Sequence, residues 1–217
     1  MKRASSILVL VASLAFALTS VASAWAGQTS APHRPAMEQH RDPRRSIEQF
    51  DATLLQVMKQ AKALSYAGRY RRLAPEIRRL FDFHTIAMLS MGNYWDKLNP
   101  AQQHILETTM RHYTIATYAA RFDGYSGESF SIKSSAPLSG QVSVVYSTLL
   151  ERDGKSHDFD YLLHPVDGHW RVINVVADGV SDLSVKRAEF AHVMKTKGFP
   201  GLIRRLNRHI ARMAHGQ

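Results

Sequence analysis

The sequence predicts an α+β fold in which a four-stranded antiparallel curved sheet is covered by N- and C-terminal helices and encloses an apolar cavity. Before Glu128, apolar residues recur at the spacing of about 3.6 residues that indicates helices. From Glu128 to Ala177 they alternate with a period of about 2, as in strands, and helical spacing returns after Ser181. Helical segments that come before and after a run of strands in the sequence indicate helices packed on a single sheet.

Two helical patterns open the ordered part of the chain. The first begins at Ser46, where Gln49 three residues later resembles a capping box, and it is broken at 66–69. The second follows this break and carries Leu73 and Ile77 on one face. We therefore expect two consecutive helices before the next capping signal.

Capping residues predict two further helices. Asp82 is placed to cap a short helix over 83–91, which Gly92 ends. Asn99-Pro100 combines an N-cap residue with proline at the first helical position, and Gln102 completes a capping box. This helix is expected to continue to about Arg121, with a buried stripe that contains Tyr113, Thr117 and their neighbours at helical spacing.

Four strands are predicted between these helices and the C-terminal part, at 129–134, 141–151, 157–164 and 169–177. Asp153-Gly154 and Asp167-Gly168 are hairpin turn signals. The period of 2 places one set of side chains on the inner face of the sheet: Val142, Val144 and Tyr146 from the second strand, and Phe159, Tyr161 and Leu163 from the third.

The C-terminal part is expected to be helical again. Ser181 is placed to cap a helix that Gly198 stops, and a last helix follows over 200–213. The apolar contacts of the first of these helices are assigned to Val185, Phe190, Val193 and Met194.

The start of the chain has the anatomy of a secretion signal. Lys2 and Arg3 precede an apolar run over 7–18, which is shorter than the roughly 20 residues of a membrane span. Small residues with Ala-x-Ala cleavage patterns follow at 22–26. We therefore expect a cleaved signal peptide and export to the periplasm. The expected organisation is a signal peptide over 1–26, a disordered leader over 27–45 and a single domain over 46–213.

Composition and motifs narrow the classes of function. The chain has no Cys, so a packed core rather than disulfides must stabilise it after export. The formal charge of +10 falls to +8 when Lys2 and Arg3 are removed, and this charge suits anionic membranes, acidic partners or solubility alone. A Gly-x-Ser-x-Gly motif and a phosphate-binding glycine loop are both absent from the sequence, which argues against a triad hydrolase and a nucleotide enzyme.

Two other functions stay open on these residues. An exported metal-binding protein is one, although a solvated outer sheet face explains the same cluster: His157, Asp158, Asp160, His164 and His169. An exported small acid–base enzyme with a cone-shaped pocket is the other, and it requires a buried acid with a raised pKa. For Asp178 we expect a structural role, accepting backbone N–H groups in the turn before Ser181.

A series of short stretches runs in order through residues 46–213: Phe81-Asp82-Phe83 with Ile86-Ala87-Met88, Tyr94-Trp95 with Leu98, Asn99 and Gln102, Tyr118 with Phe122 and Tyr125-Ser126-Gly127, Tyr161, Trp170-Arg171-Val172, and Asp178-Gly179-Val180-Ser181 with Lys186-Arg187 and Phe190. Their order and spacing resemble the MlaC-like family of periplasmic lipid-shuttle proteins, of the toluene-tolerance and phospholipid-binding type. The stretch over 177–183 and its continuation to Phe190 resemble the hopanoid-associated HpnM branch of that family.

The resemblance implies a soluble periplasmic carrier without catalytic residues or a cofactor, which transports a phospholipid or a hopanoid between inner-membrane and outer-membrane complexes. We expect a monomer that binds no nucleic acid and touches membranes only transiently. The lipid tails are expected between sheet and helices, with no charged side chain deep in the cavity, because each exposed CH₂ costs about 0.8 kcal/mol. The residues expected on the cavity wall are Phe83, Tyr113, Val144, Tyr146, Tyr161 and Val172.

Overall fold

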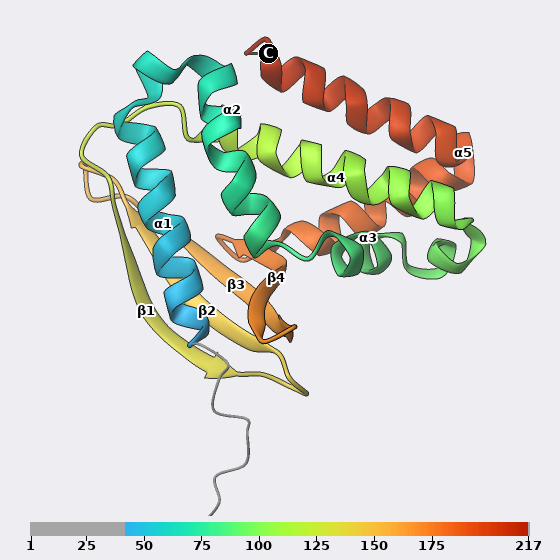
Figure 1. Ribbon diagram of the computed structural model, residues 1–217, viewed down its shortest axis with the longest axis horizontal. Coiled ribbons are helices and arrows are strands. Elements are labelled where there is room, and N and C mark those ends of the chain that lie inside the picture. The colour runs from blue at the N-terminus through green and yellow to red at the C-terminus, as the bar shows by residue number, and fades with distance from the viewer. Residues whose placement is uncertain (1–41, 217) are drawn as a thin grey trace, which may run out of the picture. The chain divides into compact units, whose positions relative to one another are not determined.

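The computed structural model describes residues 42–216 and confirms the α+β fold (Figure 1). The sheet is an antiparallel meander in the order β1-β2-β3-β4-β5, so the described residues form five strands rather than the expected four. The additional strand, β5, spans only Val180–Ser181 and pairs with the end of β4. The expected signal peptide over 1–26 and most of the expected leader over 27–45 lie outside the described residues.

Helix α1 spans Pro43–Lys59 and begins before the predicted start at Ser46. Its N-cap is Asp42, whose carboxylate accepts a hydrogen bond from the backbone N–H of Arg44 at 3.0 Å. Ser46 therefore lies within the helix, and the capping box predicted at Ser46 and Gln49 is wrong. Proline at the first helical position explains the earlier start, because the helix does not need a backbone N–H there.

Helices α2 and α3 follow closely after α1. Helix α2 spans Ala61–Leu80 and is broken at Ser65, whose φ of 53° and ψ of 178° are not helical, next to the break predicted at 66–69. Helix α3 spans Phe83–Met91, as predicted, and the Asp82 carboxylate accepts from the backbone N–H of Thr85 at 3.0 Å. Local capping chemistry therefore determined the bounds of α3.

The longest uninterrupted helix is α4, Pro100–Arg121, which follows a 3₁₀ helix, η1, over Gly92–Lys97. The predicted capping box is confirmed. The Asn99 side chain accepts from the backbone N–H of Gln102 at 2.9 Å, and the Gln102 side chain accepts from that of Asn99 at 3.1 Å.

The four long strands are β1 (Ser129–Pro137), β2 (Ser143–Leu150), β3 (Ser156–Val166) and β4 (His169–Ala177). Val145 of β2 lies opposite Tyr161 of β3, and both belong to the buried core. The inner face predicted for β3 is confirmed. The inner face predicted for β2 is wrong, because Val145 and not Val144 packs in the core under the helices. Both faces of β2 are apolar, so alternation by itself did not determine which face turns inward.

Helix α5 spans Asp182–Ala214 and is broken at Gly198, where φ is 62°, as the sequence predicted. Ser181 caps it by accepting from the backbone N–H of Ser184 at 3.2 Å. Val185, expected to make apolar contacts, is 51% exposed, and the inward position is taken by Lys186, which is 8% exposed.

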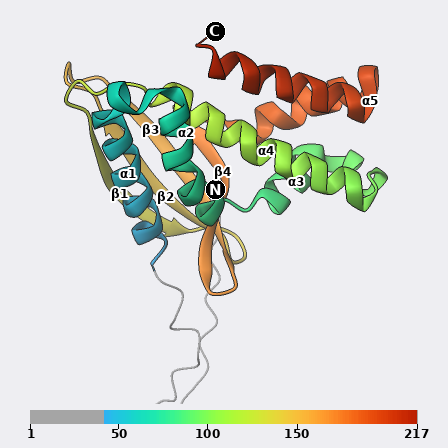
Figure 2. The same cartoon turned by 45° about the horizontal axis from the view of Figure 1, so that its top comes forward.

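The helices pack against the sheet and against one another (Figures 1 and 2). Helix α1 packs on β1 and β2, while α4 lies between α2 and α5 and contacts both. Phe81 joins these layers through a bridge to Val172 of β4, and the backbone N–H of Asp82 donates to the Val172 carbonyl at 3.0 Å. Among the described residues, no helix has both the length and the apolarity needed to cross a membrane.

Candidate functional site

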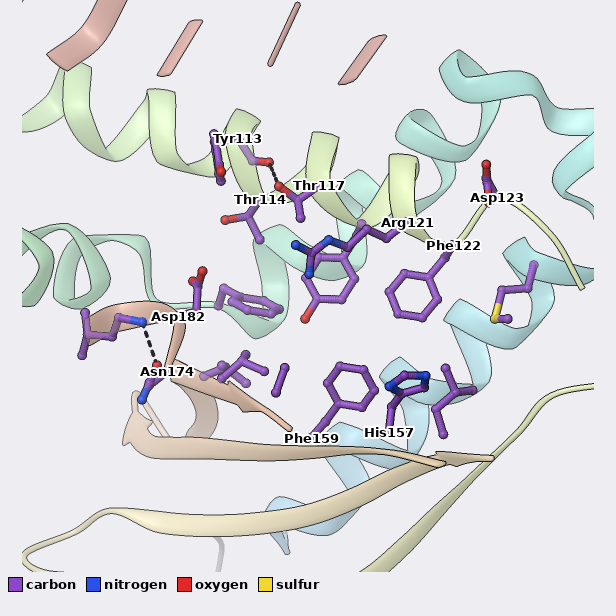
Figure 3. Close-up of a pocket in the computed structure, with 18 of the residues that line it drawn as sticks. Tyr113, Thr114, Thr117, Arg121, Phe122, Asp123, His157, Phe159, Asn174 and Asp182 are labelled. Carbon is purple, nitrogen blue, oxygen red and sulfur yellow. Dashed lines mark hydrogen bonds between the residues drawn. The ribbon is translucent and has the colours of Figure 1, made fainter. Parts of the chain in front are cut away.

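A cavity of about 490 Å³ lies between α4, the first turns of α5, and strands β3 and β4 (Figure 3). This volume is within the range of about 300–1,000 Å³ that is usual for small-molecule pockets. Helix α4 contributes one face of residues at helical spacing, including Tyr113, Thr117 and Arg121. Strand β4 contributes Val172 and Val175, and the cavity therefore depends on contacts between elements far apart in sequence.

Most of the cavity wall is apolar and aromatic. Phe122 stacks on Tyr118 with ring centroids 5.6 Å apart, and Phe159 stacks on the buried Tyr161 behind it at 6.4 Å. Burial raises the pKa of the Tyr118 hydroxyl above its ordinary value of 10.0. Aliphatic side chains complete this wall: Met58, Ile86, Leu149, Val172, Val175 and Leu183.

The end of the cavity where α4 meets the start of α5 is polar. The buried ammonium of Lys186 donates to Oδ1 of Asp182 and lies 5.2 Å from the ring centroid of Tyr113. Asn174 accepts from the backbone N–H of Leu183 at 3.1 Å, which holds the first turn of α5 at the cavity (Figure 3). The expectation that no charged side chain lines the deep cavity is therefore wrong at Lys186.

His157 lies towards the other end of the cavity, on the same side as Phe122 and Phe159 (Figure 3). Its Nδ1 is 2.9 Å from Asp178 Oδ2, and its Nε2 is 2.8 Å from Glu151 Oε1. The hydrogen bond to Asp178, followed by that to Glu151, raises the pKa of His157 because both carboxylates favour the imidazolium.

The sequence matches the family model for the MlaC protein over residues 48–208. The chain belongs to the MlaC family. A similar solved structure is that of a phospholipid-binding protein from Ralstonia solanacearum in complex with a phospholipid. The two chains superpose with a TM-score of 0.70 at 21% sequence identity, over 80% of this chain and 99% of that one. This similarity confirms the fold predicted from the sequence, and the placement in the HpnM branch stays a prediction.

In this MlaC-family protein, the six residues predicted on the cavity wall fall into three groups. Tyr113 and Val172 line the cavity. Phe83 and Tyr161 are 5% and 1% exposed and belong to the core outside the cavity lining. Tyr146 lines a separate depression with Lys133 and Asp160, and Val144 lies two residues along the same strand face.

Three residues of the metal-binding hypothesis, His157, Asp158 and His164, have hydrogen-bond partners in the structure. Within residues 42–216, no group of three or more His, Cys, Asp or Glu side chains is arranged to hold a metal ion. His164 hydrogen bonds to Asp82 at 2.8 Å, and Asp158 accepts from Lys133 Nζ at 2.8 Å. Asp178 accepts from the backbone N–H of Asp158 at 2.8 Å, so it binds a neighbouring strand rather than its own turn.

The acid–base hypothesis required a buried acid in the pocket. Desolvation raises the pKa of Asp51 to about 7. However, Asp51 lies between α1 and β2, where its Oδ2 accepts from Ser147 Oγ at 2.8 Å, and it is not among the residues that line the cavity. The geometry therefore separates this acid from the cavity.

Sequence reasoning did not identify Lys186 or Arg121 as cavity residues. A signal for Lys186 was present, because it precedes Phe190 by four residues and Val193 by seven, which places it on the apolar stripe of α5. A cation on such a stripe is unusual and marks a position with a specific partner. Arg121 gave no comparable signal, since it stands at the predicted end of its helix.

Proposed function

We propose that this protein binds a lipid in the cavity between α4 and the sheet. The observation that carries the proposal is the apolar and aromatic wall of a 490 Å³ cavity within the MlaC fold. A single 16-carbon chain costs on the order of 12 kcal/mol to hold in water, and an enclosed wall removes most of that cost. The structurally similar Ralstonia protein, which is described as phospholipid-binding, supports a phospholipid as the cargo.

The finer proposal is that of a periplasmic carrier. The protein carries a phospholipid or a hopanoid between inner-membrane and outer-membrane complexes. It contacts membranes only transiently, acts as a monomer and catalyses no reaction. Membership of the MlaC family supports this role. The wall contacts that we propose for the lipid tails are Tyr113, Phe122, Phe159, Val172 and Val175.

The test compares two adjacent valines of β4. Val175 lines the cavity, whereas Val176 is also half-buried but is not part of the lining. We expect Val175→Glu to abolish lipid retention, because an ionised carboxylate in an apolar wall is strongly unfavourable. Val176→Glu, the matched control, is expected to retain lipid.

The readout is native mass spectrometry of the protein purified from a periplasm, with extraction and identification of the bound lipid. Circular dichroism establishes that both variants fold. Recovery of a lipid-free wild-type protein, or equal lipid retention in the two folded variants, would contradict the proposal. Transport is tested separately, by measuring transfer of the extracted lipid between donor and acceptor vesicles.

A further inference from the structure

The polar end of the cavity contains a buried cation whose position needs explanation. Lys186 and Asp182 form a pair at i and i+4 along α5, an arrangement that is usually solvated on both sides. Here the lysine side chain is only 10% exposed and lines the cavity, while the aspartate side chain is 59% exposed. Both side chains line the cavity, but the cation is the buried member of the pair and its counter-ion is largely open to solvent.

The hydrogen-bonding capacity of this ammonium exceeds what its neighbours use. A lysine carries three N–H donors. Within residues 42–216, Asp182 is the hydrogen-bond acceptor for Lys186, and the second neighbour is the face of the Tyr113 ring. Donors therefore remain for a ligand.

Further polar groups surround the same position. Thr114 and Tyr113 line the cavity beside Lys186, and their hydroxyls have no hydrogen-bond partner within the part of the chain that the structure describes. Arg121 also lines the cavity, two helical turns along α4 from Thr114. An acceptor-rich anion at this end would receive charge-assisted hydrogen bonds from cations and neutral hydroxyls together.

We propose that Lys186 binds the phosphate group of a glycerophospholipid whose tails lie along the Phe122 and Phe159 wall. Asp182 is the anion that competes for Lys186 and that the lipid phosphate displaces. Asp182 is exposed, so it returns to solvent at little cost when the phosphate arrives. This inference rests on the proposed lipid-binding function and adds the chemical class of the headgroup.

The phosphate could come from a lipid or from solution, and the surroundings favour the lipid. Four carboxylates (Asp123, Glu128, Glu151 and Asp182) line the cavity together with the cations Arg121 and Lys186, so the charges of the lining give free phosphate little net attraction. A lipid phosphate is held there by its tails, because burial of their CH₂ groups supplies the attraction that a free anion lacks.

The experiment measures a preference between two lipids that differ only in the headgroup. Delipidated protein is equilibrated with mixed micelles that contain equal amounts of 1-palmitoyl-2-oleoyl-phosphatidylglycerol and the diacylglycerol with the same chains. Native mass spectrometry then gives the ratio of the two complexes. We expect the wild-type protein to favour phosphatidylglycerol about tenfold or more, which corresponds to about 1.4 kcal/mol.

Three variants change the cation or its competitor. Lys186→Met keeps an apolar stem of similar length and is expected to reduce the ratio to about one while diacylglycerol binding persists. Lys186→Arg is expected to retain a preference for the phosphate. Asp182→Asn removes the competing charge at an exposed position and is expected to raise the ratio several-fold. Repeating the measurement in the presence of millimolar inorganic phosphate tests whether the site binds the free anion.

The outcomes separate the two proposals. If no lipid binds to the wild-type protein, the proposed function fails. If lipid binds but the ratio is the same in the wild-type protein, Lys186→Met and Asp182→Asn, the headgroup assignment fails alone. Abolition of the wild-type preference by millimolar inorganic phosphate, with lipid still bound, would overturn the assignment of the site to a lipid phosphate. Should Lys186→Met not fold by circular dichroism, the preference retained by Lys186→Arg and the raised ratio of Asp182→Asn decide the question.

Discussion

Helices cover both halves of the sheet, yet one half is packed solidly and the other encloses a cavity. Over β1 and β2, α1 inserts Phe50 and Leu54, which are both 0% exposed, against a β2 face that includes the fully buried Val145. Over β3 and β4, the facing side chains Phe159 and Val175 remain partly exposed and line the cavity.

The side chains of the covering helices explain this difference. The Phe50 ring of α1 reaches three other rings, those of Phe81, Tyr118 and Tyr161, at centroid distances of 5.8, 5.2 and 6.2 Å. Helix α4 instead places Thr114 and Thr117 at the cavity. Threonine is too short to reach the sheet, so the space is left for a ligand. The short side chains of Thr114 and Thr117 therefore contribute to the space of the cavity, beside the larger Tyr113, Tyr118 and Arg121 of the same helix.

The largest effect is expected from truncation in the solid half. Phe50→Ala is expected to lower the free energy of unfolding by about 3–5 kcal/mol, because it leaves a void among three rings. Phe159→Ala in the lipid-free protein is expected to lower it by less, because this ring already borders empty space. Urea denaturation of both variants measures the two values. Equal losses would show that the two halves are packed alike.

The buried acid of the solid half should make stability depend on pH. Because burial raises the pKa of Asp51 from 3.8 to about 7, the folded protein keeps this proton after the unfolded chain has lost it. The wild-type protein is therefore expected to lose up to about 4 kcal/mol relative to Asp51→Asn as the pH rises from about 4 to 7. Unfolding free energies at several pH values measure this slope.

The control for this slope is Asp96→Asn, which removes a carboxylate at an exposed position in η1, away from Asp51. It should leave the pH profile of the wild-type protein nearly unchanged. A stability difference between the wild-type protein and Asp51→Asn that stays constant from pH 4 to 7 would show that Asp51 is not desolvated.

The smallest effect is expected at the cavity half, from His157. The pKa of His157 is raised in the folded protein, because its imidazolium binds two carboxylates. These contacts stabilise the fold fully at a pH below about 6.5, the pKa of histidine in the unfolded chain. Their stabilisation is lost as the pH rises through the pKa of His157 in the folded protein. His157→Gln should therefore be less stable than the wild-type protein at pH 5.5 and equally stable at pH 9. The loss is expected to be smaller than the effect at Asp51, because Asp178 is largely exposed and solvent screens the pair.

Thermal unfolding at these two pH values measures the His157 effect. His169→Gln, at an exposed position at the start of β4, is the comparison variant. A destabilisation of His157→Gln that is the same at both pH values would indicate lost packing rather than a lost ionic contact.

Local chemistry explains why much of the fold was predictable. The caps at Asp82, Asn99 and Ser181 and the break at Gly198 act within one helical turn, so the residues that determine them are adjacent in sequence. The strand pattern gave β4 its correct bounds for the same reason. At Ser46 a local signal was misleading, because Asp42 and Pro43 form a second start signal four residues earlier.

The wall residues were harder to predict because the same residue types build core and cavity. Tyr161 and Tyr113 both follow the correct periodicity, yet Tyr161 is buried against Phe50 while Tyr113 lines the cavity. Val144 and Val145 are neighbours of the same residue type, yet Val145 turns toward the core. Ser147 lies on the same strand face as Val145 and hydrogen bonds to Asp51 of α1. Such choices depend on partners about a hundred residues away in sequence.

The sequence by itself determined most helix bounds, the four long strands and their order, because caps, turns and periodicity are local properties of the chain. It also matches the MlaC family model over residues 48–208. Only the tertiary structure decided which face of β2 turns inward, where Lys186 lies and which residues line the cavity. These features depend on whether side chains from distant segments meet. Phe50 of α1 packs against Tyr118 of α4 and Tyr161 of β3, whereas Thr114 and Thr117 line the cavity.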